Sequence, residues 1–187
     1  MRSIIPIFAT AFVAAAPALA TEVIALPQFH TVELRGGGAV EVVPGPIERV
    51  MIVEGSSQFT RLHVEADGKL RIDTCEERCP AGYRLLVQIQ SPRVPSLAID
   101  GGGSMVTAPG FASQSELAAA VNGGGRIDAR SVDALRVSAA VNGGGDILVR
   151  PRAALSAAVN GGGHVRYLGN PATSVAIRGG GAVARAD

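Results

Sequence analysis

The chain has 187 residues, of which 47% are hydrophobic and 18% charged, and its formal net charge is +1. This near balance of charge argues against a nucleic-acid-binding protein, which usually carries a concentrated basic surface. The length suits one domain with its own core, and the 24 glycines direct attention to where in the chain they lie.

The first 20 residues have the features of a secretory signal peptide. Arg2 supplies a positive start, residues 4–13 form a short apolar run, and Ala18-Leu19-Ala20 offers the small residues that a signal peptidase reads. We therefore expect cleavage after Ala20 and a single mature domain, residues 21–187. Since no later stretch approaches the roughly 20 apolar residues of a membrane helix, we expect an exported protein in the periplasm, at the cell surface or outside the cell.

A strand-like alternation of apolar and polar residues begins near residue 31. In HTVELRGGGAVEVV, valines and leucine share one face while Glu33, Arg35 and Glu41 share the other. The same period continues in ERVMIVEG, RLHVEADGKLRID and YRLLVQIQSP, with turns expected at Gly55, Asp67-Gly68 and Pro92. The chain from Gly36 to Gly101 leaves room for about three strand-rich coils.

Cys75 and Cys79 are the only cysteines and lie four residues apart in TCEERCPAGY. An exported chain enters an oxidising compartment, where a local pair of cysteines usually forms a disulfide. The alternative is half of a zinc site, but zinc needs four ligands and only His63 lies nearby in sequence. We expect a disulfide that holds a turn, and no metal or other cofactor.

Glycine triplets recur through the second half of the chain, and three of them end the phrase AAVNGGG. The triplets begin at Gly101, Gly123, Gly143, Gly161 and Gly179, which are 18 to 22 residues apart. Such a repeat is typical of a stacked architecture. Apolar residues alternate before each triplet, as in a strand, whereas a helix interior would lose about 1 kcal/mol for each glycine. We expect an all-β fold: a single-domain parallel β-helix, or solenoid, with coils of about 18–22 residues and glycine-triplet corners.

Asparagine precedes the triplet in three successive repeats, at Asn122, Asn142 and Asn160. Stacked asparagines can form a ladder of amide hydrogen bonds, and asparagine tolerates the left-handed backbone that a corner requires. We expect a structural corner ladder; the alternative is an exposed polar row that touches a ligand.

Three segments together resemble a known family. They are FHTVELRGGGAVEV from Phe29, DGKLRI from Asp67 and LVQIQSPRVPSLAIDGGGS from Leu86. They are similar to the head GIN domain, also called the putative auto-transporter adhesin head domain. The resemblance implies an exported, β-helical bacterial domain, and it supplies no catalytic residues. The cysteine pair is an individual feature of this chain.

Catalytic and ion-binding motifs find little support. The glycine triplets lack the strand–GxxxxGK–helix context of a phosphate loop, and the residues after them do not repeat the aspartate of calcium-binding nonapeptides. The competing function is a polysaccharide-active hydrolase or lyase, and hydrolysis needs two carboxylates at a fixed separation. Only Asp128 and Asp146 follow triplets in neighbouring repeats, and they do so at different registers.

The expected function is therefore non-enzymatic. A face of Ser, Ala and Asn side chains beside glycine corners would be flat, and it would suit contact with another flat surface. The candidate partners are a cell-envelope polysaccharide, another protein or a second copy of the chain, and the candidate function is an adhesin-like or structural module of the cell envelope.

Overall fold

The computed structural model describes residues 21–75 and 78–186. Within these ranges the chain forms fifteen strands of one sheet, and no helix long and apolar enough to cross a membrane is present. The predicted all-β character agrees with this structure. The expected signal peptide, residues 1–20, lies outside the described residues.

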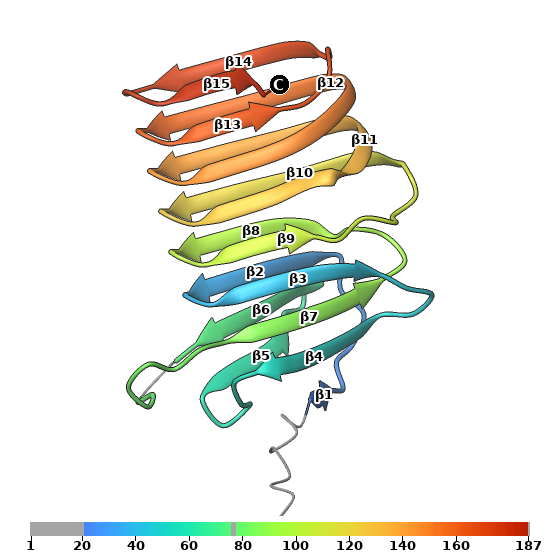
Figure 1. The fold of residues 1–187 in the computed structure, drawn as a ribbon, viewed down its shortest axis with the longest axis vertical. Helices are drawn as coiled ribbons and strands as arrows, with labels where there is room; N and C mark the ends of the chain where they lie inside the picture. Colours follow the sequence, from blue (N-terminus) through green and yellow to red (C-terminus); the bar gives the residue numbers. More distant parts are fainter. Residues whose placement is uncertain (1–20, 76–77, 187) are drawn as a thin grey trace, which may run out of the picture.

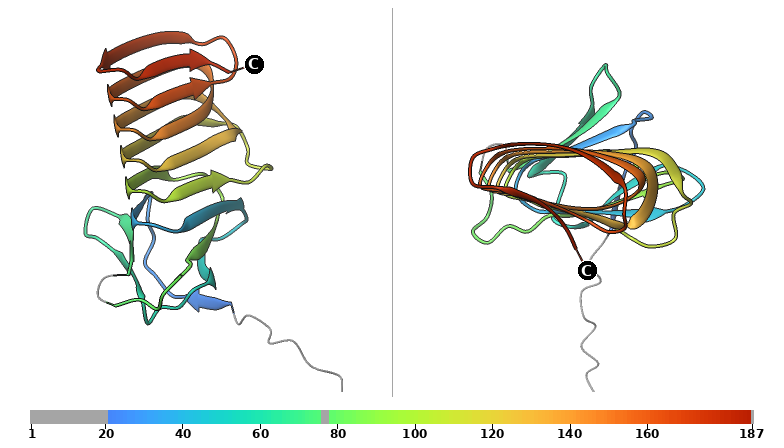
Figure 2. Two further views of the ribbon diagram at one scale, coloured as in Figure 1. Left: turned by 60° about the vertical axis from the view of Figure 1, so that its left-hand side comes forward. Right: turned by 90° about the horizontal axis from the view of Figure 1, so that it is seen from above.

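The sheet curls over on itself, so that two layers of strands face each other across the core (Figures 1 and 2). Two long strands, β11 (Arg126–Gly143) and β12 (Asp146–Gly161), pass from one layer into the other. The first layer also contains β6 (Lys69–Thr74), β2 (Thr31–Gly36), β8 (Ser96–Gly101), β10 (Gln114–Gly123) and β14 (Ala172–Arg178). The second also contains β7 (Leu86–Ser91), β3 (Ala39–Pro44), β9 (Ser104–Thr107), β13 (His164–Tyr167) and β15 (Ala182–Arg185).

The parallel strands of both layers stack in register. Val121 lies beside Val141, and Val141 lies beside Val159, with exposed fractions of 1%, 1% and 2%. Alternation places every second residue of these strands between the layers, where each buried branched side chain contributes about 1.5–3 kcal/mol. The interior row of valines that the repeat predicts is therefore the core of this part of the protein.

The glycine triplets connect the first layer to the second. The first glycine of each has a left-handed backbone, as in Gly123 and Gly143, whose φ angles are 122° and 116°. A Cβ atom on Gly143 would lie 2.6 Å from the carbonyl oxygen of Gly123. Glycine is thus required both for the turn and for the close approach of neighbouring backbones.

The N-terminal end of the sheet is built differently. Strands β1 (Glu22–Ile24), β4 (Arg49–Glu54) and β5 (Thr60–Val64) complete the fifteen. β4 pairs antiparallel with both β1 and β7, and β5 pairs antiparallel with β6. The prediction of a parallel β-helix, or solenoid, is therefore wrong: the fold is one mixed sheet, curled into a half-barrel.

The antiparallel pairing of β5 with β6 has a local cause. Asp67 and Gly68 form a tight turn in which Gly68 has a φ angle of 75°, and Asp-Gly between alternating strands favours a hairpin over a crossover. In place of the three coils expected, the segment from Gly36 to Gly101 contains β3, β4, the β5–β6 hairpin, β7 and β8, and β4 and β7 are antiparallel neighbours. Strand β2 pairs with β6 on one side and β8 on the other, although these strands are distant in sequence.

Candidate binding face

The outer surface of the first layer carries small side chains over several successive strands. We call this surface the Ser/Ala face; it comprises Ser96, Ala98, Ala118, Ala120, Ser138, Ala140, Ser156 and Ala158. These residues form two columns because the strands are in register. In one column Ala120 lies between Ala98 and Ala140, and in the other Ala118 lies beside Ser138. The face is hollowed into a shallow depression of ≈ 380 Å³.

The small side chains are the outward half of the same alternation that fills the core. Ala118 and Ala120 are exposed, whereas Leu117, Ala119 and Val121 are buried. No side chain longer than serine interrupts the two columns from β8 to β12. A ligand can therefore approach the sheet closely along the whole length of the face.

The three asparagines form a third column beside the face. Asn122, Asn142 and Asn160 lie in register one above another, and all three are exposed. The side-chain amide of Asn122 donates a hydrogen bond of 3.3 Å to the carboxylate of Asp100. Among the described residues, no hydrogen bond joins the three amides to one another. The three asparagines are thus aligned, and the side chains of Asn142 and Asn160 are exposed.

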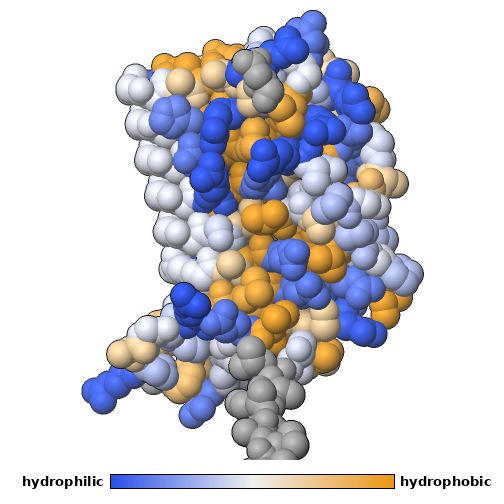
Figure 3. Space-filling model, viewed as in Figure 1, coloured by the Kyte–Doolittle hydropathy of each residue, from blue (hydrophilic) through white to orange (hydrophobic). Residues whose placement is uncertain are grey.

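The corner beyond this column is a smooth edge of backbone. The middle glycines of the triplets, Gly102, Gly124, Gly144 and Gly162, are exposed, and a Cβ atom on any of them would meet nothing within 4 Å. Figure 3 shows the edge as a pale strip on the left, where Figure 1 places the corners. Nothing in the structure explains why the middle position is glycine.

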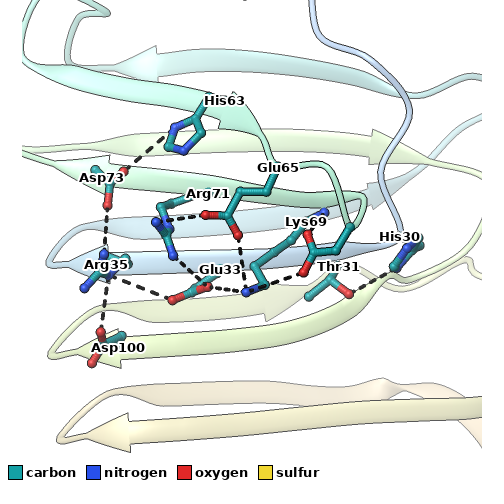
Figure 4. A network of polar contacts seen from close by, with 11 residues as sticks. His30, Thr31, Glu33, Arg35, His63, Glu65, Lys69, Arg71, Asp73 and Asp100 are labelled. Atoms are coloured by element: carbon teal, nitrogen blue, oxygen red, sulfur yellow. Dashed lines mark hydrogen bonds and ion pairs between the residues drawn. The ribbon is translucent and has the colours of Figure 1, made fainter.

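A cluster of charged residues borders the Ser/Ala face at its N-terminal end (Figure 4). The Lys69 ammonium lies 3.3 Å from the Glu33 carboxylate and 3.4 Å from that of Glu65. The hydrogen bond and the charge of Glu33, followed by those of Glu65, raise the pKa of Lys69 above its ordinary value. Arg71 pairs with Glu65 at 2.9 Å, and the Arg35 guanidinium donates a hydrogen bond of 3.2 Å to Asp100.

This cluster is not apparent as a unit in the sequence. Its members come from β2, β6, β8 and the β5–β6 turn, which the pairing of β2 between β6 and β8 brings together. The available signal was the outward alternation of charges, as in Glu33 and Arg35 or Lys69, Arg71 and Asp73. In the fold the cluster marks where the neutral face ends.

The two aspartates of the competing enzymatic function lie on the outer surface of the second layer. Asp146 is opposite Arg126, and Asp128 is opposite Leu148, so the two carboxylates are on neighbouring strands but out of register. Asp128 pairs with Arg130 at 2.9 Å, and Asp146 lies 3.6 Å from the ring of His164. The Asp128 carboxylate thus belongs to a surface ion pair of the kind that sheets commonly carry, and the Asp146 carboxylate has the His164 ring as its neighbour.

The structure joins Cys75 and Cys79 by a disulfide. The pair follows β6, and the backbone N–H of Cys75 donates a hydrogen bond of 3.0 Å to the carbonyl of Phe59, whose ring lies edge-on to that of Tyr83. The described residues contain no group of three or more His, Cys, Asp or Glu side chains placed to hold a metal ion.

Part of the chain matches the model of a known family. Residues 96–171, from β8 to just past β13, match the model of the family described as "Putative auto-transporter adhesin, head GIN domain". The resemblance predicted from sequence is confirmed over this segment. No curated protein matches the chain.

Solved structures show a shared fold. A "putative adhesin" from Bacteroides fragilis NCTC 9343 is 18% identical with a TM-score of 0.54, and the match covers 89% of this chain and 96% of that one. A "putative lipid binding protein" from Parabacteroides distasonis ATCC 8503 is 16% identical with a TM-score of 0.36, covering 90% and 96%. A "putative adhesin" from Parabacteroides merdae ATCC 43184 is 14% identical with a TM-score of 0.40, covering 90% and 96%. Only the first of these likenesses is close enough to support an argument, and at this identity it concerns the fold alone.

Proposed function

We propose that the protein is an exported, non-enzymatic, adhesin-like module that binds a cell-envelope polysaccharide through the Ser/Ala face. The observation that carries the proposal is the uninterrupted stack of small outward side chains over β8, β10, β11 and β12. The adhesin names of the matching family and of the Bacteroides fragilis structure point in the same direction.

The chemistry of the face suits a repeating polymer. Asparagine amides on β10, β11 and β12, and serine hydroxyls on β11 and β12, recur at the spacing of hydrogen-bonded strands, which is about 4.8 Å. Each can donate and accept hydrogen bonds. The alanines between them leave apolar area against which the flat carbon–hydrogen faces of sugar rings can pack. Aromatic residues make up only 4% of the chain, so we expect contact through this face in place of aromatic stacking.

The binding test uses one substitution at the centre of the face and a matched one elsewhere. Ala120→Glu introduces a long charged side chain among the small ones, at an exposed position where folding should be unaffected. Ala153→Glu makes the same change at an exposed position at the bend of β12. In pull-down assays with purified envelope polysaccharide, we expect Ala120→Glu to lose binding and Ala153→Glu to retain it.

The same preparations decide between binding and turnover. We expect no depolymerisation of acidic or neutral polysaccharides by the intact protein. Cleavage that disappears in Asp128→Asn or Asp146→Asn would contradict the non-enzymatic function and favour the hydrolase or lyase. Binding to envelope proteins but to no polysaccharide would contradict the proposed ligand class.

Export is a separate part of the proposal and has its own test. The charged start, apolar run and Ala-Leu-Ala end at residues 18–20 support cleavage after Ala20. Mass spectrometry of protein purified from the periplasm or the cell surface should show a chain that begins at Thr21. Protease treatment of intact cells then distinguishes surface exposure from retention in the periplasm, and full-length chain in the cytoplasm would contradict export.

A further inference from the structure

The C-terminal end of the stack has an unpaired strand edge. Strand β14 pairs only with β12, and β15 pairs only with β13, whereas β12 has partners on both sides. Within the described residues, nothing covers the outer edges of β14 and β15, which lie together at the top of Figure 1. The N–H and C=O groups on that edge can form hydrogen bonds with a further strand.

Core residues become exposed at the same end. Val175 and Ile177 lie in register with Ala157 and Val159, which are 3% and 2% exposed. Val175 and Ile177 themselves are 46% and 44% exposed, because β14 has no strand on its outer side among the residues that the structure describes. The apolar column that is buried through the preceding repeats therefore ends in solvent.

This edge lacks the features by which proteins usually prevent pairing. β14 is seven residues long and contains no proline or charge between Ala172 and Ile177. At the opposite end of the molecule, β5 has five residues and carries Arg61 and His63, and β1 has three residues. Short and charged edges resist association, whereas a long apolar edge promotes it.

We propose that the C-terminal end binds the C-terminal end of a second copy, forming a two-fold symmetric dimer in which β14 pairs antiparallel with β14 of the partner. The partner must offer a free strand of similar length with apolar residues at every second position. The C-terminal end of another copy has both properties, and the short N-terminal edges do not. A two-fold axis through the middle of β14 closes the assembly, so the dimer does not extend into a fibre.

Charge does not oppose this pairing. Centred on Val175, the antiparallel register places Thr173 opposite Ile177 of the partner, and Arg178 opposite Ala172 of the partner. The two Arg178 residues are then six strand positions apart, which is roughly 20 Å and beyond the Debye length of about 8 Å at physiological salt.

The size of the end sets the expected affinity. A strand of seven residues across two layers spaced about 10 Å apart presents roughly 450 Å² per copy, or about 900 Å² in total. Because this area is at the lower limit of specific interfaces, we expect dissociation constants in the micromolar range, about 1–100 μM.

The symmetry gives a sharp test by sedimentation velocity. The intact mature protein should change from monomer to dimer as its concentration rises through this range. Val175→Lys and Val175→Glu should each be monomeric, because the symmetry places like charges opposite each other. An equimolar mixture of the two variants should dimerise again, since Lys then faces Glu. Leu135→Lys, at a residue that is 49% exposed on another surface, should dimerise like the intact protein.

Each other outcome overturns the proposal. An intact protein that stays monomeric throughout has no such interface. Association that survives in Val175→Lys would place the contact away from β14. Association that is lost only in Ala120→Glu would place the contact on the Ser/Ala face. If the two charged variants remain monomeric when mixed although circular dichroism shows both to be folded, the two-fold pairing about Val175 is wrong.

Discussion

Substitution of the glycines within a single triplet tests whether the corner, and not the glycine-rich composition, specifies the stack. Gly143 has a φ angle of 116°, and its Cβ atom would lie 2.6 Å from the carbonyl oxygen of Gly123. Gly144, its neighbour, has open space where a Cβ atom would project. Gly143→Ala and Gly144→Ala are therefore the same chemical change in two different environments.

The expected free energies of unfolding differ by several kcal/mol. Gly143→Ala combines a backbone conformation that costs about 1–3 kcal/mol with an overlap that costs about 1–3 kcal/mol more, so we expect a loss of about 2–6 kcal/mol. For a domain of this size, that corresponds to a decrease in Tm of roughly 10 °C. Gly144→Ala should change stability by no more than about 0.5–1 kcal/mol, and in the stabilising direction where its backbone allows.

Urea and thermal unfolding followed by circular dichroism measure both variants against the intact protein. The reasoning also predicts a large loss for Gly145→Ala, whose Cβ atom would overlap Val121 and the carbonyl oxygen of Gly125. Equal losses for Gly143→Ala and Gly144→Ala would refute the reasoning, because the local backbone geometry would then not be what the triplet provides.

Three further predictions concern the core, the disulfide and the charged cluster. Val141→Asp should lose at least about 4 kcal/mol in urea unfolding, because it removes a buried side chain and places an unpaired carboxylate between Val121 and Val159; a near-native midpoint would contradict the core assignment. Replacing Cys75 and Cys79 by Ser should cost only about 1–2 kcal/mol, because the loop is short, and thiol titration of the denatured, unreduced protein should find no free thiol. The pKa of Lys69 is raised in the folded state. The contribution of its ammonium group to folding stability is therefore complete below the pKa of the unfolded state and is lost as the pH rises through the pKa of the folded state. Lys69→Met should remove this alkaline decrease in Tm, and an unchanged pH profile would contradict the role of Glu33.

The sequence predicts the repeated part of the fold well because one physical requirement recurs there. A glycine triplet, an asparagine before it and a valine two residues before it specify the corner, the outward column and the core. The register of Val121, Val141 and Val159 follows directly from those positions. Local alternation and steric demand are sufficient in such a segment, because each strand pairs with the repeat before it.

The N-terminal part could not be predicted in the same way. The insertion of β2 between β6 and β8 joins residues that are tens of positions apart, and alternation gives no information about which strands become neighbours. Asp67-Gly68 predicts a turn, and a hairpin is the form that this dipeptide favours between alternating strands. The charged cluster around Lys69 was missed for the same reason, since its members are outward residues of strands whose order the sequence leaves open.

The spacing of the last three triplets has a consequence for how the length of the molecule can change. Gly143, Gly161 and Gly179 are 18 residues apart, and the same columns pass through all three repeats. Excision of residues 144–161 would therefore leave every side chain in its column and shorten the stack by one strand spacing, about 4.8 Å. Excision of a single residue would instead move the buried side chains of the following strand to the solvent-exposed face and the exposed ones to the core. The chain can thus be lengthened or shortened in whole repeats. Duplication or loss of the DNA that encodes one repeat would change the length of the stack, and of the Ser/Ala face, in discrete steps.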